Sequence, residues 1–213
     1  MGAAQALQAN NDWTLGAELI SQGELVVFPT DTVYGVGCDP YNPAAIARIY
    51  EAKGRSTLKA IPVLLAGVEY LSQVALVVPL AAEILGSAYW PGALTLVVPR
   101  RPELPEILSG TDTLAVRVPD HDDLRQMIRA CGGAIAATSA NLSGDPDATD
   151  AEMARAYLGQ WVALVIDGGP TRGGVPSTVV DCIVSPPRVL REGAITASDI
   201  TDALRQGLES ASC

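Results

Sequence analysis

Short apolar runs recur along the chain, separated by polar turns and amphipathic segments. Runs of roughly four to eight residues rich in Val, Ile and Leu are typical of buried β-strands. Strands are predicted on this pattern at residues 24–28, 61–65, 93–98, 113–118, 134–138, 162–166 and 177–184. Pro29 is expected to stop the first strand, and Trp90-Pro91-Gly92 is expected to form the turn before the third.

Helices are predicted where apolar residues recur at every third or fourth position. In the segment 43–53, Asn42 and Pro43 suit the start of a helix, and Gly54 suits the position after its end. Other helices are predicted at 12–22, within 68–87, from 120 or 121 to 131, after a capping box of Thr149 and Glu152, and from 198 to about 209.

Strands and helices are interleaved along the chain, which predicts an α/β or α+β fold. Because some strands follow each other without an intervening helix, we expect a mixed, open sheet flanked by helices. The 213 residues suffice for one substantial core, and no linker rich in Pro, Ser or charge divides them. A single domain over residues 1–213 is therefore predicted, with its core at about 12–195.

The composition argues against several classes of protein. Residues 1–10 lack the basic start and apolar core of a secretory signal, and no apolar run approaches the ~20 residues that span a bilayer. We therefore expect a cytoplasmic protein without membrane contact. The four cysteines show neither paired nor metal-ligand spacing, and the chain has one histidine. Neither a zinc site nor a histidine-based triad is expected.

The distribution of charge gives the first indication of chemistry. The formal net charge is −10 and the pI is about 4.5, which argues against tight nonspecific binding of nucleic acid. Both lysines, Lys53 and Lys59, nevertheless fall in one stretch with Arg55, Ser56 and Thr57. Cations and hydroxyls gathered in this way are typical of an anion site. The alternative is that Lys53 only complements the dipole at the end of its helix.

Three polar loops each leave a short apolar strand, where α/β sheets commonly present ligand groups. They are residues 29–35, 138–144 and 173–178. Each loop alone has the composition of an ordinary turn. Together they predict a site lined by hydroxyls and by backbone that a ligand can approach closely.

Arg117 lies within the apolar run 113–118, and a half-buried arginine normally needs an anionic partner. That partner is either a ligand or an internal carboxylate, Asp31 or Asp181. Arg191 raises the same question more weakly.

The common nucleotide fingerprints, the P-loop and the Gly-x-Gly-x-x-Gly turn, are absent from the sequence. A phosphoryl compound would therefore be bound by dispersed Lys, Arg, Ser and Thr side chains. Catalysis would depend on positioning and charge neutralisation rather than on a covalent nucleophile.

The order of these segments closely resembles the YrdC-like threonylcarbamoyl-AMP synthase family over about residues 12–195. The matching motifs are Pro29 to Gly37, Lys53 to Arg55, Trp90 to Thr95, Val116 to Pro119, Thr138 to Gly144, Ser177 to Asp181 and Leu190 to Gly193. The resemblance implies a mixed, twisted sheet around a concave groove.

The resemblance also implies an enzyme, a nucleotidyltransferase that condenses L-threonine, bicarbonate and ATP to threonylcarbamoyl-AMP and pyrophosphate. Mg²⁺ is expected on the triphosphate itself, with no metal bound directly by the protein. The product supplies the threonylcarbamoyl group of tRNA threonylcarbamoyladenosine. Downstream tRNA threonylcarbamoyl-transfer proteins are therefore implied as partners, together with a weak RNA contact.

The same resemblance distributes roles over the motifs. Lys53 and Arg55 would be catalytic. L-threonine would be held by Thr30, Arg117, Ala137 and Ser177. ATP would be held by Lys53, Thr57, Thr113, Ser139, Asn141 and Arg191.

The sequence departs from the family pattern in two places. Ala93 stands where many relatives have proline, and residues 59–62 differ from the usual Asn-Pro-Leu or Lys-Pro, which affects the start of the threonine pocket. Because the chain ends at residue 213, the C-terminal domain of the longer family members is expected to be absent.

Two other functions compete with the synthase. A double-stranded RNA-binding module without catalysis would use the same groove, although the acidic pI argues against it. A carbamoyl-transfer domain of the hydrogenase-maturation type would share the sheet, but such proteins are long chains with zinc-binding segments, and this sequence has no Cys-x-x-Cys.

Overall fold

One mixed β-sheet runs through the part of the chain that the structure describes. The structure is a computed structural model that describes residues 3–171 and 175–211, with side chains at residues 12–171 and 175–210. Its strands are β1 (Val26–Pro29), β2 (Tyr34–Cys38), β3 (Val63–Leu65), β4 (Leu94–Pro99), β5 (Thr113–Arg117), β6 (Ala134–Ser139), β7 (Leu164–Val165), β8 (Thr178–Asp181) and β9 (Arg188–Arg191).

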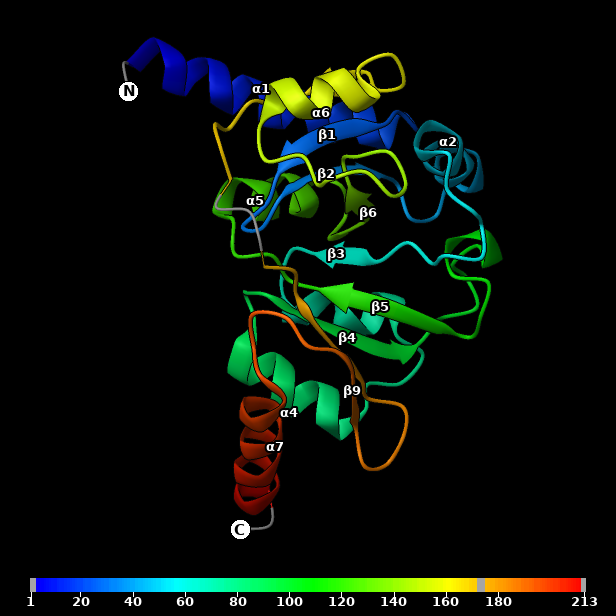
Figure 1. The fold of residues 1–213 in the computed structure, drawn as a ribbon, viewed down its shortest axis with the longest axis vertical. Helices are drawn as coiled ribbons and strands as arrows, with labels where there is room; N and C mark the ends of the chain where they lie inside the picture. The colour runs from blue at the N-terminus through cyan, green and yellow to red at the C-terminus, as the bar shows by residue number, and fades with distance from the viewer. Residues whose placement is uncertain (1–2, 172–174, 212–213) are drawn as a thin grey trace.

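Within the described residues the strands form a single sheet in the order β7-β1-β2-β6-β3-β5-β4-β8-β9. The pairs β1–β7, β3–β5 and β4–β8 are parallel, and the other neighbours are antiparallel. Figure 1 shows the strands stacked along the long axis of the molecule, with helices packed beside them. The predicted mixed, twisted sheet with flanking helices is confirmed.

Seven helices pack beside the sheet in the described part of the chain. They are α1 (Ala3–Ser21), α2 (Pro43–Lys53), α3 (Leu71–Val74), α4 (Leu80–Tyr89), α5 (Asp122–Ala130), α6 (Ala151–Leu158) and α7 (Ala197–Ala211), with short 3₁₀ turns at Val68–Tyr70 and Glu106–Leu108. Among the described helices, none combines the length and the apolar character that a membrane span requires.

Alternate residues of the strands point into two separate apolar cores, as the period of a β-strand requires. Val27 belongs to the larger core, which contains buried residues of α2, α4, α6 and α7. Val26 and Phe28, on either side of it, belong to the smaller core with α1 and α5. The smaller core covers its face only from β1, across β2 and β6, to β3.

The uncovered part of this face is where polar side chains begin. Leu64 of β3 lies in the smaller core and pairs in register with Arg117 of β5. Paired residues on neighbouring strands point to the same face. Arg117 therefore points to the face of α1 and α5, beyond the area that these helices cover.

The structure corrects the sequence predictions at several elements. No strand was predicted at Tyr34–Cys38, whose first two residues were placed in the loop 29–35, but this segment is the fully buried strand β2. Its Gly37 lies under the ring of Phe28, where a Cβ atom would stand 2.9 Å from a ring carbon. Glycine is needed here for close packing, although it is typical of turns in a sequence.

Other corrections concern boundaries and caps. The first strand includes Pro29, which pairs with Tyr34, rather than stopping before it. The predicted strand 177–184 is shorter and is followed by β9, which was not predicted. The N-cap of α6 is Asp150, whose side chain accepts a hydrogen bond from the Met153 amide, so the predicted capping box of Thr149 was wrong.

Candidate functional site

A cavity of about 600 Å³ opens on the uncovered part of the sheet. It is lined by residues of β2, β3, β4, β5, β6 and β9 and by loop residues, among them those that follow β1 and precede β8. The residues predicted from the sequence that line it are Thr30, Arg55, Arg117, Ala137, Ser139, Ser177 and Arg191. The three polar loops therefore meet at one place, although Gly173 and Gly174 of the third loop lie outside the described residues.

Four of the predicted residues do not line this cavity. Lys53 and Asn141 are buried beneath it in a hydrogen-bond network. Thr57 is exposed in the turn after α2. Thr113 lies at the opposite end of β5 from Arg117, and its hydroxyl is 2.9 Å from that of Thr111.

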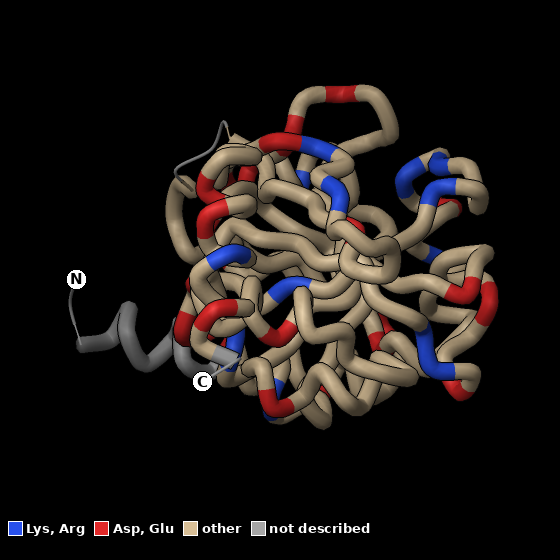
Figure 2. Tube along the Cα trace, turned by 90° about the horizontal axis from the view of Figure 1, so that it is seen from below, with Lys and Arg blue, Asp and Glu red and all other residues tan. Residues whose placement is uncertain are grey.

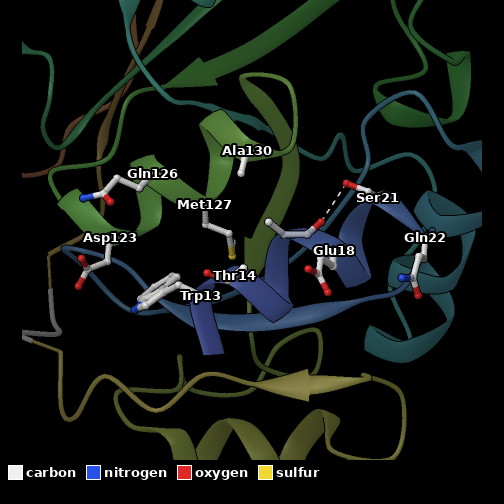
Figure 3. Close-up of a pocket in the computed structure, with 10 residues that line it drawn as sticks. Trp13, Thr14, Glu18, Ser21, Gln22, Asp123, Gln126, Met127 and Ala130 are labelled. Atoms are coloured by element: carbon white, nitrogen blue, oxygen red, sulfur yellow. Dashed lines mark hydrogen bonds between the residues drawn. The ribbon is translucent and has the colours of Figure 1, made fainter. Parts of the chain in front are cut away.

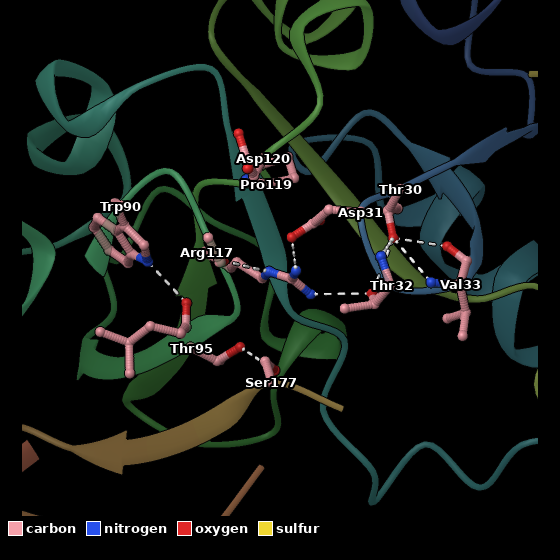
Figure 4. A network of polar contacts seen from close by, with 12 residues as sticks. Thr30, Asp31, Thr32, Val33, Trp90, Thr95, Arg117, Pro119, Asp120 and Ser177 are labelled. Atoms are coloured by element: carbon pink, nitrogen blue, oxygen red, sulfur yellow. Dashed lines mark hydrogen bonds and ion pairs between the residues drawn. The ribbon is translucent and has the colours of Figure 1, made fainter. Parts of the chain in front are cut away.

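Arg117 is held in place by three contacts, which Figure 4 shows. Its Nε donates to the Gly92 carbonyl at 2.9 Å, one Nη to the Thr32 hydroxyl at 3.3 Å, and the other Nη to Asp31 Oδ2 at 2.6 Å. A guanidinium has five N–H groups, so two remain for a ligand. The internal salt bridge considered from the sequence is present, and Arg117 nevertheless lines the cavity.

Thr30 closes the turn between β1 and β2. Its hydroxyl donates to the Val33 carbonyl at 2.7 Å and accepts from the backbone amides of Thr32 and Val33. A threonine side chain that bonds its own turn fixes the local backbone. The turn therefore presents Thr30 and Thr32 to the cavity in a defined position.

Lys53 connects the end of α2 to the loop after β6. Its ammonium donates to the Ser139 carbonyl, to the Asn141 carbonyl at 2.6 Å, and to Asn141 Oδ1 at 3.2 Å. The side chain is 2% exposed, and burial, followed by the nearby Arg55 charge, lowers the pKa of Lys53 to about 8. Lys53 therefore does more than complement a helix dipole, because it positions a second segment of the site.

The loop after β6 is tied together by further bonds. The Ser139 hydroxyl donates to Asn141 Oδ1 at 2.6 Å, and the side-chain Nδ2 of Asn141 donates to the Asp145 carbonyl at 2.6 Å. The backbone amide of Ser143 donates to the Lys53 carbonyl at 2.9 Å. Such a connected network fixes the Ser139 side chain at the edge of the cavity.

Arg55 and Arg191 line the cavity without a carboxylate partner among the described residues. Arg55 donates to the carbonyls of Lys59 and Ala60, and burial lowers its pKa. Arg191 donates to the Ser177 carbonyl at 2.8 Å and 3.2 Å. A guanidinium group carries a positive charge and favours an anionic ligand.

Several residues of the cavity were not predicted from the sequence. Thr95 is one, since its hydroxyl lies 2.8 Å from that of Ser177. Thr95 is the one polar residue in the apolar run 94–98, and like Arg117 in its strand it could have indicated a polar partner or a ligand. The other polar lining residues that were given no individual role are Thr32, Tyr34 and Thr138, which fall within the predicted loops, and Asp147 and Thr149.

Tyr34 supports the site from below. Its hydroxyl donates to the Gly169 carbonyl at 2.7 Å and accepts from the Gly168 amide at 3.2 Å. Burial raises its pKa, so the hydroxyl keeps its proton at neutral pH. Tyr34 thus anchors the segment that follows β7.

A larger groove of about 730 Å³ lies between α1 and α5 (Figure 3). Its walls include Trp13, Glu18, Asp123 and Met127, and its lining contains no lysine or arginine. None of the predicted site residues lies there. Size alone does not make it the candidate site, because the convergent cations and hydroxyls surround the smaller cavity.

The described part of the chain offers neither an activated thiol nor a protein metal cage. Burial raises the pKa values of Cys38, Cys131 and Cys182 to about 12, so these thiols stay protonated. No three His, Cys, Asp or Glu side chains of this part lie together as metal ligands. The cavity can bind and orient anions, but it contains no buried nucleophile beside a base.

Comparisons with known proteins agree with this geometry. A profile of the family described as "Telomere recombination", which groups Sua5, YciO and YrdC proteins, matches residues 18–193. The chain is 43% identical to a threonylcarbamoyl-AMP synthase of Bacillus subtilis over 86% of its length. It is 39% identical to a putative threonylcarbamoyl-AMP synthase of Mycobacterium tuberculosis over 91% of its length, which is 88% of that relative.

Solved structures extend the likeness to three dimensions. The structure of P. abyssi Sua5 complexed with L-threonine superimposes with a TM-score of 0.86 at 40% identity, covering 90% of this chain and 56% of that one. E. coli YciO superimposes with a TM-score of 0.80 at 26% identity, covering 90% and 93%. The chain spans about half the length of the Bacillus subtilis and P. abyssi relatives, 54% and 55%.

Proposed function

The chain belongs to the Sua5, YciO and YrdC family, and from that premise we propose that it is an L-threonylcarbamoyladenylate synthase. The reaction condenses L-threonine, bicarbonate and ATP to threonylcarbamoyl-AMP and pyrophosphate. The observation that carries the proposal is the arrangement of three arginines around one cavity. Arg117 is locked by protein contacts with two N–H groups to spare, whereas Arg55 and Arg191 have no carboxylate partner among the described residues.

The amino-acid subsite is proposed around Arg117. Its spare N–H groups would form a forked pair with the α-carboxylate of L-threonine. Thr30, Ala137 and Ser177 line the same cavity and would contact the rest of the amino acid. The relative from P. abyssi with bound L-threonine supports a site for this substrate in the shared fold.

The nucleotide is proposed to lie against the remaining cations. Arg55 and Arg191 would offset the charge of the triphosphate, with Ser139 as a hydroxyl donor. Lys53 and Asn141 would act from beneath, since they hold the loop that presents Ser139. The proposed contacts of Thr57 and Thr113 with ATP would require a ligand that reaches beyond the cavity.

Chemistry in this site would proceed by positioning. An oxygen of N-carboxylated threonine would attack the α-phosphorus of ATP, and pyrophosphate would leave in line with it. Two anions must be brought together, so cations around both lower the barrier. Mg²⁺ is proposed to arrive with the triphosphate, which fits a cavity lined by three arginines and one exposed aspartate, Asp147.

The RNA-binding alternative has less support. Figure 2 shows basic and acidic positions interspersed along the trace rather than gathered into one basic face. Delivery of the product to tRNA threonylcarbamoyl-transfer proteins in the cytoplasm, with a weak RNA contact, remains part of the proposal. If RNA were the ligand, the protein would bind duplex RNA with steep salt dependence and without consuming ATP.

A pyrophosphate-release assay with each substrate omitted in turn tests the proposed function. Release should require ATP, L-threonine and bicarbonate together. Arg55→Ala should abolish it, whereas Arg48→Ala, which removes an ion pair between Arg48 of α2 and Glu24 in the segment before β1, should not. Release without a threonine requirement would contradict the proposal.

A further inference from the structure

Asp31 lies immediately behind the wall of the cavity. Its neighbours Thr30 and Thr32 both line the cavity, and its Oδ2 is 2.6 Å from Arg117 Nη2. The two side chains are only 15% and 10% exposed. At this distance and burial, the carboxylate offsets most of the charge of the guanidinium.

The second oxygen of Asp31 has no protein partner. Oδ1 is buried and accepts no hydrogen bond from the described residues. Buried polar atoms are nearly always satisfied, so an exception calls for an explanation. The unpartnered oxygen leaves negative potential at the place where Arg117 meets the cavity.

The other cavity arginines differ in this respect. Arg55 donates only to carbonyl oxygens, and Arg191 only to the carbonyl and hydroxyl of Ser177. Neither has a carboxylate partner in the described part of the chain. Among the described residues, the cavity therefore combines two arginines that no carboxylate contacts with one arginine whose charge a contacting carboxylate offsets.

We propose that Asp31 is a specificity-determining residue that reserves Arg117 for a zwitterionic amino acid and keeps polyphosphate away from it. This inference rests on the proposed function and deepens it. A neutral pair of charges attracts a polyanion weakly, so phosphates bind at Arg55 and Arg191. A free amino acid carries both an ammonium and a carboxylate, which match the two charges of the pair. Asp31 acts through its charge and by orienting Arg117, and it does not need to contact the ligand directly.

The test is Asp31→Asn, which keeps the shape of the side chain and an acceptor for Arg117 but removes the charge. Calorimetric titrations use three probes: L-threonine, (R)-3-hydroxybutanoate, which is threonine without its ammonium, and inorganic pyrophosphate. The unmodified protein should prefer L-threonine over (R)-3-hydroxybutanoate by about tenfold or more. The variant should lose most of that preference and bind pyrophosphate about tenfold more tightly.

A purely structural role for Asp31 gives a different pattern. If the carboxylate only holds Arg117 in place, both organic ligands should weaken by the same factor and pyrophosphate affinity should not rise. That pattern would overturn the proposal. Asp181→Asn is the matched control, since Asp181 is similarly buried, pairs with Arg188 and lies outside the cavity lining.

The proposal stays testable if the variant does not fold. Equal affinity of the unmodified protein for L-threonine and (R)-3-hydroxybutanoate would overturn it without any variant. Failure of the proposed function gives a distinct result: L-threonine is preferred, yet no adenylate forms. If adenylate forms and the Asp31→Asn variant still prefers L-threonine over (R)-3-hydroxybutanoate, the proposed function stands and only the inference about Asp31 is wrong.

Discussion

The ammonium of Lys53 donates a 2.6 Å hydrogen bond to the carbonyl oxygen of Asn141. It also bonds Asn141 Oδ1 and the Ser139 carbonyl, so one buried lysine fastens the end of α2 to the loop after β6. The sequence indicated a cation at an anion site, and the structure shows that this cation organises the wall of the site. The other lysine, Lys59, is exposed.

Lys53→Met should therefore lower both stability and activity. The change leaves two buried carbonyl groups without their donor, at a cost of about 1–3 kcal/mol for each group. Urea unfolding measures the loss, and Lys59→Met is the control that should unfold like the unmodified protein. Full stability with a defect only in the Michaelis constant for ATP would show that Lys53 contacts phosphate instead.

The free energy of unfolding should depend on pH through Lys53. Burial lowers its pKa from 10.5 to about 8. Below pH 8 the folded protein bears the full cost of a buried charge, and between pH 8 and 10.5 it releases the proton that the unfolded chain still binds. The unmodified protein should therefore gain about 2 kcal/mol relative to Lys53→Met between pH 7 and 9.5. A constant difference across that interval would contradict this pKa.

Arg117→Lys should impair the use of threonine more than that of ATP. Lysine keeps the charge, but it cannot reach Gly92, Thr32 and Asp31 together and still offer two parallel N–H groups. The Michaelis constant for threonine should rise by about tenfold or more, with that for ATP nearly unchanged. Equal effects on both constants would remove Arg117 from the amino-acid site.

The salt bridge adds a consequence for stability. Arg117→Ala leaves Asp31 buried without its partner, and the free energy of unfolding should fall by about 3–5 kcal/mol. Measuring thermal unfolding of both variants separates the structural part of the role of Arg117 from its part in binding.

Much of this arrangement was predictable from the sequence, because the signals were local. The apolar runs predicted most strands, and Asn42, Pro43 and Gly54 marked the ends of α2 correctly. The family resemblance is confirmed. The strand β2 was missed because its glycines fit under the Phe28 ring, a packing contact that no local pattern reveals.

The roles within the site depended on contacts between distant segments. Lys53 and Asn141 are 88 positions apart, and Arg117 and Asp31 are 86 apart. The sequence left two partners open for Arg117, a ligand or a carboxylate, and the fold allows both because the guanidinium has donors on more than one side. Thr95 lies beside Ser177 in the site because β4 pairs with β8 in a register that the sequence alone does not define.

Tyr34→Phe should loosen the segment after β7. The hydroxyl bonds both Gly168 and Gly169, and its removal should cost about 1–2 kcal/mol of stability and speed amide exchange at Gly168. Tyr41→Phe is the control, since the Tyr41 hydroxyl is exposed and makes one long bond of 3.3 Å to the Gln73 carbonyl. Equal behaviour of the two variants would argue against an anchoring role for Tyr34.

The proposed function is tested most directly by following the carbon of bicarbonate into product. Protein, ATP with Mg²⁺, L-threonine and [¹⁴C]bicarbonate are mixed, and the nucleotides are separated and identified by mass. The prediction is a labelled adenylate that contains threonine, formed in equal amount to pyrophosphate, by the unmodified protein and by Arg48→Ala but not by Arg55→Ala. Consumption of ATP without ¹⁴C in any adenylate, or no ATP consumption by the folded, unmodified protein, would contradict it.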